Sequence, residues 1–418
     1  MVILRPLKKL VNLKESNMLV KICKSQPKGK IIAPPSKSYS HRYLLGAMLA
    51  NNDSVISNIC CSEDIMATLN CMPSFGRAYK FDGNKVFISR CIDTFANPVF
   101  NCNESGSTLR FIIPIAMTQF DSAEFIGTEK LISRGISVYE DIFAKQAIKV
   151  NKFKDKIIIE GRLKSGYFEV DGSISSQFIT GLLYALPLLN GDSVIKLIPP
   201  INSKDYIDMT LKVLSDYQIK YEYEENQIKV FGNQKYKGNN CSVEGDYSNA
   251  AFLEALNYLG GKLNVNGLIK NSLQGDKVYR EYFEKLDDDY CEINIENCID
   301  LGPVLMVFAA LKNGAKFTGT KRLAIKESNR AMAIKEELIK VGISVDVKED
   351  EVIVYKGIIT PPSTTFDSHN DHRIAMALSL LSTLFDIEIA SAEAVNKSYP
   401  NYFEELEKVG VKILYETK

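Results

Sequence analysis

The chain has 418 residues, more than a single hydrophobic core usually organises, so two domains are expected. Lys plus Arg and Asp plus Glu both number 51, so no overall basic field favours nucleic acid or an anionic membrane as a partner. No apolar run is long enough to span a bilayer. Any anion-binding site must therefore be local.

The segment 1–17 is basic and mildly amphipathic, but it lacks the continuous apolar stretch of a signal peptide. We therefore expect a flexible extension and a cytoplasmic protein. The cysteines form no Cys-x-x-Cys pair, and the histidines His41, His369 and His372 show no metal-ligand spacing. We expect reduced cysteines and no bound metal.

Residues 31–50 are typical of a strand, a breaker, a polar loop and a helix. Pro34-Pro35 ends the apolar run, and the polar residues 36–42 precede an apolar helical segment at 43–50. This pattern places hydroxyls, Lys37 and Arg42 at one helix N-terminus, where free N–H groups favour an anion. For this stretch alone, a capped helix start with solvated cations is the simpler alternative.

Further along the chain, pairs of alternating strands joined by a polar turn recur and predict β-hairpins. The predicted hairpins are Arg77–Ser89, Ile148–Gly161, Ile219–Gly232 and Ile343–Gly357. The first three begin at even spacing, and the longer gap before the last leaves room for a weakly marked copy near Glu284–Asn294.

Apolar helices introduced by small or polar residues alternate with these hairpins. The predicted helices are Ser38–Ala50, Ser105–Met117, Ser175–Leu189, Asp246–Leu259, Asp300–Leu311 and Asp371–Leu384. Together the two series indicate about six units of strand, helix, strand, helix and hairpin. Because this unit is longer than those of ordinary solenoids, closed globular repeat domains are expected.

Cations gather where these helices begin. Arg42, Arg110 and Arg373 lie near the starts of apolar helices, and Arg330 opens another amphipathic helix. A cation in a first helical turn opposes the helix dipole, so local stability does not explain these arginines. Surface solvation could explain any one of them, but the set is better explained by a shared ligand with several negative charges.

The sequence contains no P-loop, no Gly-x-Gly-x-x-Gly after a strand and no evident Ser/His/Asp set. Candidates for acid–base chemistry are Asp300, Glu327 and the lysines of the polar loops. Two alternatives stay open, because Asp300 could cap its helix and Glu327 could pair with Arg330.

Several motifs together resemble the 5-enolpyruvylshikimate-3-phosphate (EPSP) synthase family, also called 3-phosphoshikimate 1-carboxyvinyltransferases, over roughly 19–418. In chain order, the motifs are Ser36-Lys37-Ser38 with Arg42, Ser105-Gly106 with Arg110, Ser133-Arg134, Ser175-Ser176-Gln177, Gly245-Asp246, Lys326-Glu327-Ser328-Asn329-Arg330, Asn370-Asp371-His372-Arg373 and Lys397-Ser398-Tyr399-Pro400.

The resemblance implies an α/β fold of two similar inside-out α/β barrel domains, each made of three βαβαββ repeats, with the active site in the interdomain cleft. It also implies that one discontinuous domain comprises 1–35 plus 245–418, so that this domain carries both termini. Residues 36–244 would then form the inserted domain.

The implied reaction transfers the enolpyruvyl group of phosphoenolpyruvate to the 5-hydroxyl of shikimate 3-phosphate and releases phosphate, a step of aromatic amino-acid biosynthesis that uses no cofactor. The residues implied to bind shikimate 3-phosphate are Lys37, Ser38, Arg42, Ser175, Ser176, Gln177, Ser203, Asp300, Arg322 and Lys326. Those implied to bind phosphoenolpyruvate are Lys37, Gly106, Arg134, Gln177, Arg330, Arg373 and Lys397. Asp300 is the candidate base, and Glu327 with Lys37 or Lys397 the candidate proton carriers. We expect a monomer whose partners are these two substrates, without nucleic acid or membrane.

The sequence departs from the family pattern near the site. Glu104 stands where an asparagine is often found and adds a carboxylate near an anion site. His41 stands where asparagine is usual, Phe111 replaces a proline, and Arg322 falls where an asparagine contacts the shikimate phosphate in some members. These changes bear more on affinity than on reaction type.

Two alternatives remain. The related enolpyruvyl transferase that acts on UDP-N-acetylglucosamine has Lys-Asn in place of Lys37-Ser38 and a cysteine in a mobile loop, whereas no cysteine lies near Arg134 here. A catalytically impaired homologue that only binds anionic metabolites belongs to another class, and the presence of Asp300 and Glu327 argues against it.

Overall fold

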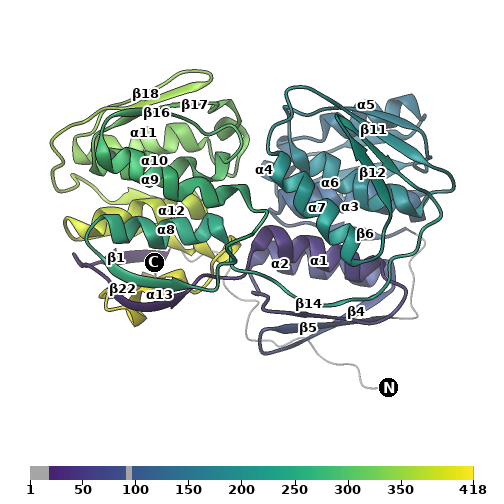
Figure 1. The fold of residues 1–418 in the computed structure, drawn as a ribbon, viewed down its shortest axis with the longest axis horizontal. Helices are drawn as coiled ribbons and strands as arrows, with labels where there is room; N and C mark the ends of the chain where they lie inside the picture. The colour runs from purple at the N-terminus through teal and green to yellow at the C-terminus, as the bar shows by residue number, and fades with distance from the viewer. Residues whose placement is uncertain (1–17, 91–96, 418) are drawn as a thin grey trace.

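A computed structural model describes residues 18–90 and 97–417, which form two groups of elements side by side (Figure 1). One hydrophobic core is built from residues between Tyr39 and Val243. The other combines Val20, Ile22 and Ile31 with residues between Tyr247 and Ile413. We call 37–243 the first half and the remaining described residues the second half. The predicted extension at 1–17 lies outside the described residues.

Each sheet of the first half repeats one pattern, in which a parallel strand pair is extended by an antiparallel hairpin. The sheets, in spatial order, are β14 (Asn240–Ser242), β3 (Ser54–Ser57), β5 (Lys85–Arg90) and β4 (Arg77–Asp82); β6 (Val99–Asn101), β7 (Ser122–Ile126), β9 (Lys156–Glu160) and β8 (Lys149–Lys152); and β10 (Tyr167–Asp171), β11 (Ser193–Ile198), β13 (Gln227–Val230) and β12 (Tyr221–Glu224).

The second half repeats the full pattern in one sheet and builds the other two with strands from distant parts of the chain. Its sheets are β16 (Cys291–Asn294), β17 (Ala315–Thr318), β19 (Glu351–Val354) and β18 (Val345–Val347); β20 (Phe366–Asp367), β21 (Ile387–Ala390), β1 (Met18–Ile22) and β22 (Ile413–Thr417); and the pair β15 (Lys262–Asn266) and β2 (Lys28–Ile32). The N-terminal strand β1 lies antiparallel between β21 and β22.

Most helices lie on the inside of each half with the sheets around them, whereas α5 and α13 lie at the edge of the molecule in this view (Figure 1). Those of the first half are α1 (Lys37–Leu49), α2 (Glu63–Cys71), α3 (Gly106–Gln119), α4 (Glu129–Ser133), α5 (Ser137–Lys145), α6 (Ser176–Ala185) and α7 (Lys204–Asp216). Those of the second half are α8 (Tyr247–Tyr258), α9 (Tyr279–Asp288), α10 (Gly302–Leu311), α11 (Arg330–Leu338), α12 (His372–Leu378) and α13 (Tyr402–Lys408). Within 18–90 and 97–417, no helix has both the length and the apolar character needed to cross a membrane.

The four predicted hairpins and the six predicted apolar helices are confirmed, within a few residues at their ends. The weakly marked hairpin near Glu284–Asn294 is wrong, because this segment contains the end of α9 and the strand β16. Tyr279, Phe283 and Leu286 are buried at helical spacing, and this apolar face fixes α9 as a helix against the core.

The chain passes between the halves twice, at adjacent places. Pro35 and Gly245 form an isolated antiparallel bridge, with N–H groups of Ser36 and Asp246 donating to Glu244 O and Pro34 O at 2.8 Å each. Both crossings are therefore held together by backbone hydrogen bonds. The domain boundaries at 35/36 and 244/245 stay a prediction.

Candidate active site

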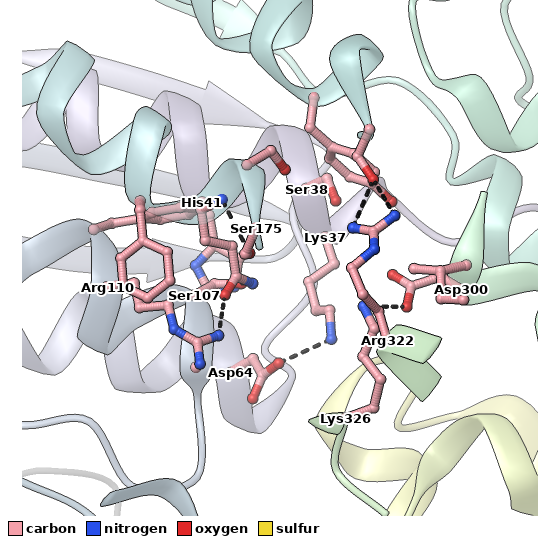
Figure 2. A pocket seen from close by; sticks show the side chains of 18 of the residues that line it. Lys37, Ser38, His41, Asp64, Ser107, Arg110, Ser175, Asp300, Arg322 and Lys326 are labelled. Carbon is pink, nitrogen blue, oxygen red and sulfur yellow. Dashed lines mark hydrogen bonds and ion pairs between the residues drawn. The ribbon is translucent and has the colours of Figure 1, made fainter. Parts of the chain in front are cut away.

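A cavity lies between the two halves, and side chains from both line it (Figure 2). The predicted site residues that line it are Lys37, Ser38, Arg42, Gly106, Arg134, Ser175, Ser176, Gln177, Ser203, Asp300, Arg322, Lys326, Glu327 and Arg373. A smaller cavity shares Arg134 and Glu327 with it and is also lined by Glu104, Lys130 and Lys397. Arg330 lines neither cavity.

Three helices of the first half begin at the cavity. The hydroxyls of Ser36, Ser105 and Ser175 cap α1, α3 and α6 by accepting backbone N–H groups. Capped N-termini present positive dipole ends, which favour an anion in the cavity. A Cβ at Gly106, at the start of α3, would lie 3.0 Å from Nη1 of Arg134, so a larger residue there would crowd the arginine head.

Arg42 is held among neutral groups, although it is only 3% exposed. Its guanidinium donates to Thr210 Oγ1 at 2.9 Å, to Ser38 O at 2.8 Å and to Tyr206 O at 2.9 Å. The rings of Phe111 and Tyr206 lie 5.8 and 5.7 Å from it. Burial lowers the pKa of Arg42 below its ordinary value. Its positive charge is therefore fixed beside the cavity but not neutralised.

Arg110 is likewise a buried arginine whose hydrogen-bond partners are neutral. It donates to Gln177 Oε1 at 2.6 Å, and Gln177 Nε2 in turn donates to Ser107 Oγ at 3.0 Å. Burial and the nearby Arg134 lower the pKa of Arg110. This chain fixes the Gln177 amide at the cavity wall, where it can orient a ligand.

The second half instead places a carboxylate, Asp300, among cations. Asp300 receives Arg330 Nη1 at 2.8 Å and Lys326 Nζ at 3.0 Å, and Arg373 Nη2 lies at 3.4 Å. Burial alone raises the pKa of Asp300, but Arg373, Lys326 and Arg330 hold it well below its usual range. Asp300 lies within a short 3-10 turn, η4 (Ile299–Leu301), and the N-cap of the following helix α10 is Leu301 rather than Asp300. Its surroundings are those of an ionised site residue.

Arg330 lies behind the cavity wall and is 1% exposed. It donates Nε to Asp371 Oδ2 at 2.8 Å and also bonds Asp300 and Glu327. Burial lowers the pKa of Arg330, but Asp371, Glu327 and Asp300 raise it above its ordinary value. Burial likewise raises the pKa of Glu327, which Arg330 then holds well below its usual range. Arg330 thus ties together three carboxylates.

Lys37 stands at the crossing between the halves, where it begins α1. Its Nζ pairs with Asp64 Oδ2 at 2.8 Å (Figure 2), and its backbone N–H donates to Asp246 Oδ2 at 2.9 Å. Burial lowers the pKa of Lys37, but Asp64 and Glu327 raise it above its ordinary value. Lys37 is therefore a firmly protonated cation aimed into the cavity.

Two further side-chain contacts connect the halves beside the cavity. Arg322 Nη1 donates to Ser203 Oγ at 3.1 Å, and Lys397 Nζ pairs with Glu104 Oε2 at 2.6 Å. Both involve a position where the sequence departs from the family pattern, Arg322 and Glu104. Neither pairing could be read from the sequence.

Some lining residues were missed by the sequence interpretation, namely Asp64, Tyr206 and Ser248. Tyr206 is recoverable, because it follows Ser203 by one helical turn at the start of α7 and so shares its face. Asp64 and Ser248 carry no local signal, since their position depends on how distant helices meet.

In the part of the chain that the structure describes, no group of three or more His, Cys, Asp and Glu side chains could hold a metal ion. The expectation that the protein needs no metal or cofactor stays a prediction. The cations, amide and hydroxyls suit a ligand with phosphate and carboxylate groups.

Comparisons with known proteins agree with this chemistry. A family model described as EPSP synthase (3-phosphoshikimate 1-carboxyvinyltransferase) matches residues 23–406. Curated relatives named 3-phosphoshikimate 1-carboxyvinyltransferase include one from Clostridium perfringens, 39% identical over 93% of this chain and 97% of that protein, and one from Clostridium novyi, 38% identical over 94% and 97%.

Solved structures support the fold. An EPSP synthase from Acinetobacter baumannii superposes with a TM-score of 0.77 at 21% identity and covers 96% of this chain and 100% of its own. An enolpyruvyl transferase from Streptomyces tendae gives 0.76 at 14% identity, with 97% and 100% covered. The prediction of two inside-out α/β barrel domains is thereby confirmed.

Proposed function

The chain belongs to the EPSP synthase family, and we propose that the cavity between its halves binds shikimate 3-phosphate and phosphoenolpyruvate together. The reaction transfers the enolpyruvyl group of phosphoenolpyruvate to the 5-hydroxyl of shikimate 3-phosphate and releases phosphate, as a step of the shikimate pathway. The observation that carries the proposal is the convergence of hydroxyls and cations from both halves on one cavity.

Shikimate 3-phosphate is assigned to the part of the cavity lined by serines and lysines. Ser175, Ser176 and Ser203 supply hydroxyls, and Lys326 and Arg322 supply charge for the phosphate. The remaining contacts are assigned to Lys37, Ser38, Arg42, Gln177 and Asp300.

Phosphoenolpyruvate is assigned to the neighbouring part, around Gly106 and Arg134. Gly106 lets backbone N–H groups of α3 approach the anion closely. Lys37, Gln177, Arg373 and Lys397 complete this site. Arg330 acts on it through charge and through the carboxylates that it holds, because it lines neither cavity.

In the first step, the 5-hydroxyl adds to C2 of phosphoenolpyruvate while C3 takes up a proton, which gives a tetrahedral intermediate. Asp300 is assigned as the base, because its cations keep it ionised and ready to accept the hydroxyl proton. In the second step, phosphate leaves C2 as C3 loses a proton. Glu327 with Lys37 or Lys397 is assigned to carry the C3 proton, and fixed charges stabilise both steps.

All these groups come from one chain, which supports a monomer as the working unit. We assign the enzyme to the cytoplasm, where phosphoenolpyruvate is produced. The alternative reaction with UDP-N-acetylglucosamine is not favoured, because relatives at 38–39% identity are named 3-phosphoshikimate 1-carboxyvinyltransferases.

The test measures phosphate release with phosphoenolpyruvate plus either shikimate 3-phosphate or UDP-N-acetylglucosamine. Turnover with shikimate 3-phosphate alone is expected. Turnover only with the nucleotide sugar would overturn the substrate assignment, and binding of both substrates without turnover would favour a catalytically impaired homologue.

A further inference from the structure

One ion pair joins the two halves of the molecule. Lys397 Nζ lies 2.6 Å from Glu104 Oε2, and among the described residues 18–90 and 97–417 this is the only ion pair between the first and second halves. The Lys397 side chain is 6% exposed and that of Glu104 23%. The Lys397 ammonium also donates to Asn370 O at 2.7 Å. The Lys397 ammonium therefore has two oxygen partners, one from each half.

The place of this pair gives it a consequence for binding. Glu104 and Lys397 line the smaller cavity, which shares the lining residues Arg134 and Glu327 with the larger one. An anion that enters near Lys397 meets the Glu104 carboxylate at once. Like charges repel across a few ångströms, and the low polarisability of a partly buried site strengthens the effect.

We propose that Glu104 determines the affinity of the site for its phosphate-bearing anion by competing for Lys397. The Glu104 carboxylate neutralises Lys397, so an incoming phosphate or carboxylate must displace Glu104 to pair with the ammonium. When the product phosphate leaves, Glu104 pairs with Lys397 again. This inference rests on the proposed function only for the identity of the anion.

The other cations beside the cavity are placed differently. Asp64 pairs with Lys37 within the first half, and Asp300 pairs with Lys326 and Arg373 within the second half. These acids stay beside their cations however the halves are arranged. Among the described acids, only Glu104 pairs with a cation of the opposite half. A ligand that binds between the halves therefore competes with Glu104 for Lys397 before it affects the other ion pairs.

The main experiment titrates inorganic phosphate and, separately, phosphoenolpyruvate into the full-length protein by calorimetry. Glu104→Gln keeps the shape of the side chain and removes its charge. We expect both anions to bind roughly fivefold more tightly, as removal of one nearby charge predicts in a partly screened site. In turnover assays, KM for phosphoenolpyruvate should fall while KM for shikimate 3-phosphate stays unchanged.

The matched control is Glu129→Gln. Glu129 lies in the neighbouring helix α4 but pairs with Lys154 at the surface, where both side chains are exposed. It should leave the affinity for both anions unchanged. In a Lys397→Met background, Glu104→Gln should lose most of its effect, because no ammonium remains for which it competes and only the direct repulsion of the anion is relieved.

Unchanged or weaker anion binding in Glu104→Gln would overturn the inference, as would an equal gain in the Lys397→Met background. A rise in KM for both substrates would show instead that the pair mainly holds the cleft closed, and would also overturn it. The calorimetric comparison needs no turnover. If the wild-type protein bound phosphate but converted neither substrate pair, the proposed function would fail while the role of Glu104 could still be decided.

Discussion

Arg42 and Arg330 are both almost completely buried beside the same cavity, yet their partners differ. Arg42, in the first half, bonds hydroxyls and backbone carbonyls, and burial lowers its pKa. Arg330, in the second half, bonds three carboxylates that raise its pKa despite burial. Through Arg42 the first half thus offers a positive charge that no carboxylate neutralises, whereas Arg330 in the second half is balanced by ionised acids.

This difference suggests a division of labour. Cations held by neutral groups keep their attraction for a phosphorylated ligand. A network of carboxylates and cations gains less from one more anion, but it keeps Asp300 and Glu327 ionised and oriented for proton transfer. The first half should therefore matter most for affinity, and the second half most for turnover and for charge balance in the fold.

The largest effect is expected from Asp300→Asn, which removes the assigned base without changing its shape. The turnover number should fall by about 10²–10⁴-fold, whereas KM for both substrates should change little. Initial rates of phosphate release check this, with Asp346→Asn, at an exposed carboxylate of the same half, as the control. Full activity of the Asp300→Asn variant would show that Asp300 is not the base. It would also contradict the proposal that the second half matters most for turnover.

Arg330→Met should destabilise the fold more than Arg42→Met. Loss of Arg330 leaves Asp300, Glu327 and Asp371 close together with less compensating charge, which typically costs about 3–5 kcal/mol of unfolding free energy. Phosphoenolpyruvate binding should weaken as well. Loss of Arg42 leaves only neutral acceptors unpaired and should cost less. Urea unfolding of both variants compares them, and equal losses would contradict the difference between the halves.

Arg42→Lys should weaken the binding of shikimate 3-phosphate by about 1.5–3 kcal/mol, the value of hydrogen bonds to a charged group. A lysine cannot reach the acceptors that Thr210, Ser38 and Tyr206 offer to the planar guanidinium. Calorimetric titration measures this, with the exposed Arg162→Lys as the matched control. If Arg42→Lys bound shikimate 3-phosphate as tightly as the wild type, the affinity of the site would not depend on the guanidinium of Arg42.

The smallest effect on stability is expected from two histidines, which differ in the same way as the two arginines: one has a neutral partner and the other a carboxylate. His41 bonds the Thr68 hydroxyl, and burial with Lys37 and Arg42 lowers its pKa, whereas the Glu337 carboxylate at 2.9 Å raises the pKa of His369 above 6.5. The His369 pair therefore stabilises the fold fully below pH 6.5, and this contribution is lost as the pH rises through the raised folded-state pKa.

His369→Gln should accordingly reduce the free energy of unfolding by up to about 1 kcal/mol at about pH 6 and by less at about pH 8. His41→Asn should show no such dependence, since His41 stays neutral throughout this range. Urea unfolding at both pH values compares the two variants. If the unfolding free energies of both variants depended equally on pH, the difference in charge between the two histidine sites would be contradicted.

Much of the fold could be predicted because it depends on local patterns. Alternation of apolar and polar residues predicted the hairpins, and polar residues before apolar runs predicted the helices. In the structure, Ser36, Ser105 and Ser175 in such polar stretches cap α1, α3 and α6. The segment near Glu284–Asn294 was misjudged because its polar residues hide the buried spacing of α9. A three-residue apolar face is a weak signal without the core that it contacts.

The site was predictable in its residue types and less so in its pairings. The sequence indicated cations at helix entrances, but not that Arg330 lies behind the wall or that Glu104 reaches Lys397. Pairings between distant segments depend on the closure of both halves, and charge alone does not select among so many possible partners. The capping alternative for Asp300 was settled only by the cations around it.

The position of β1 between β21 and β22 bears on how the protein emerges during synthesis. Residues up to Val243 can complete the first core while the ribosome is still translating the rest. Strand β1 precedes the first half along the chain, but its neighbours β21 and β22 follow most of the second half. Strand β1 must therefore stay without these partners, beside a finished first half, until β21 and β22 have been made.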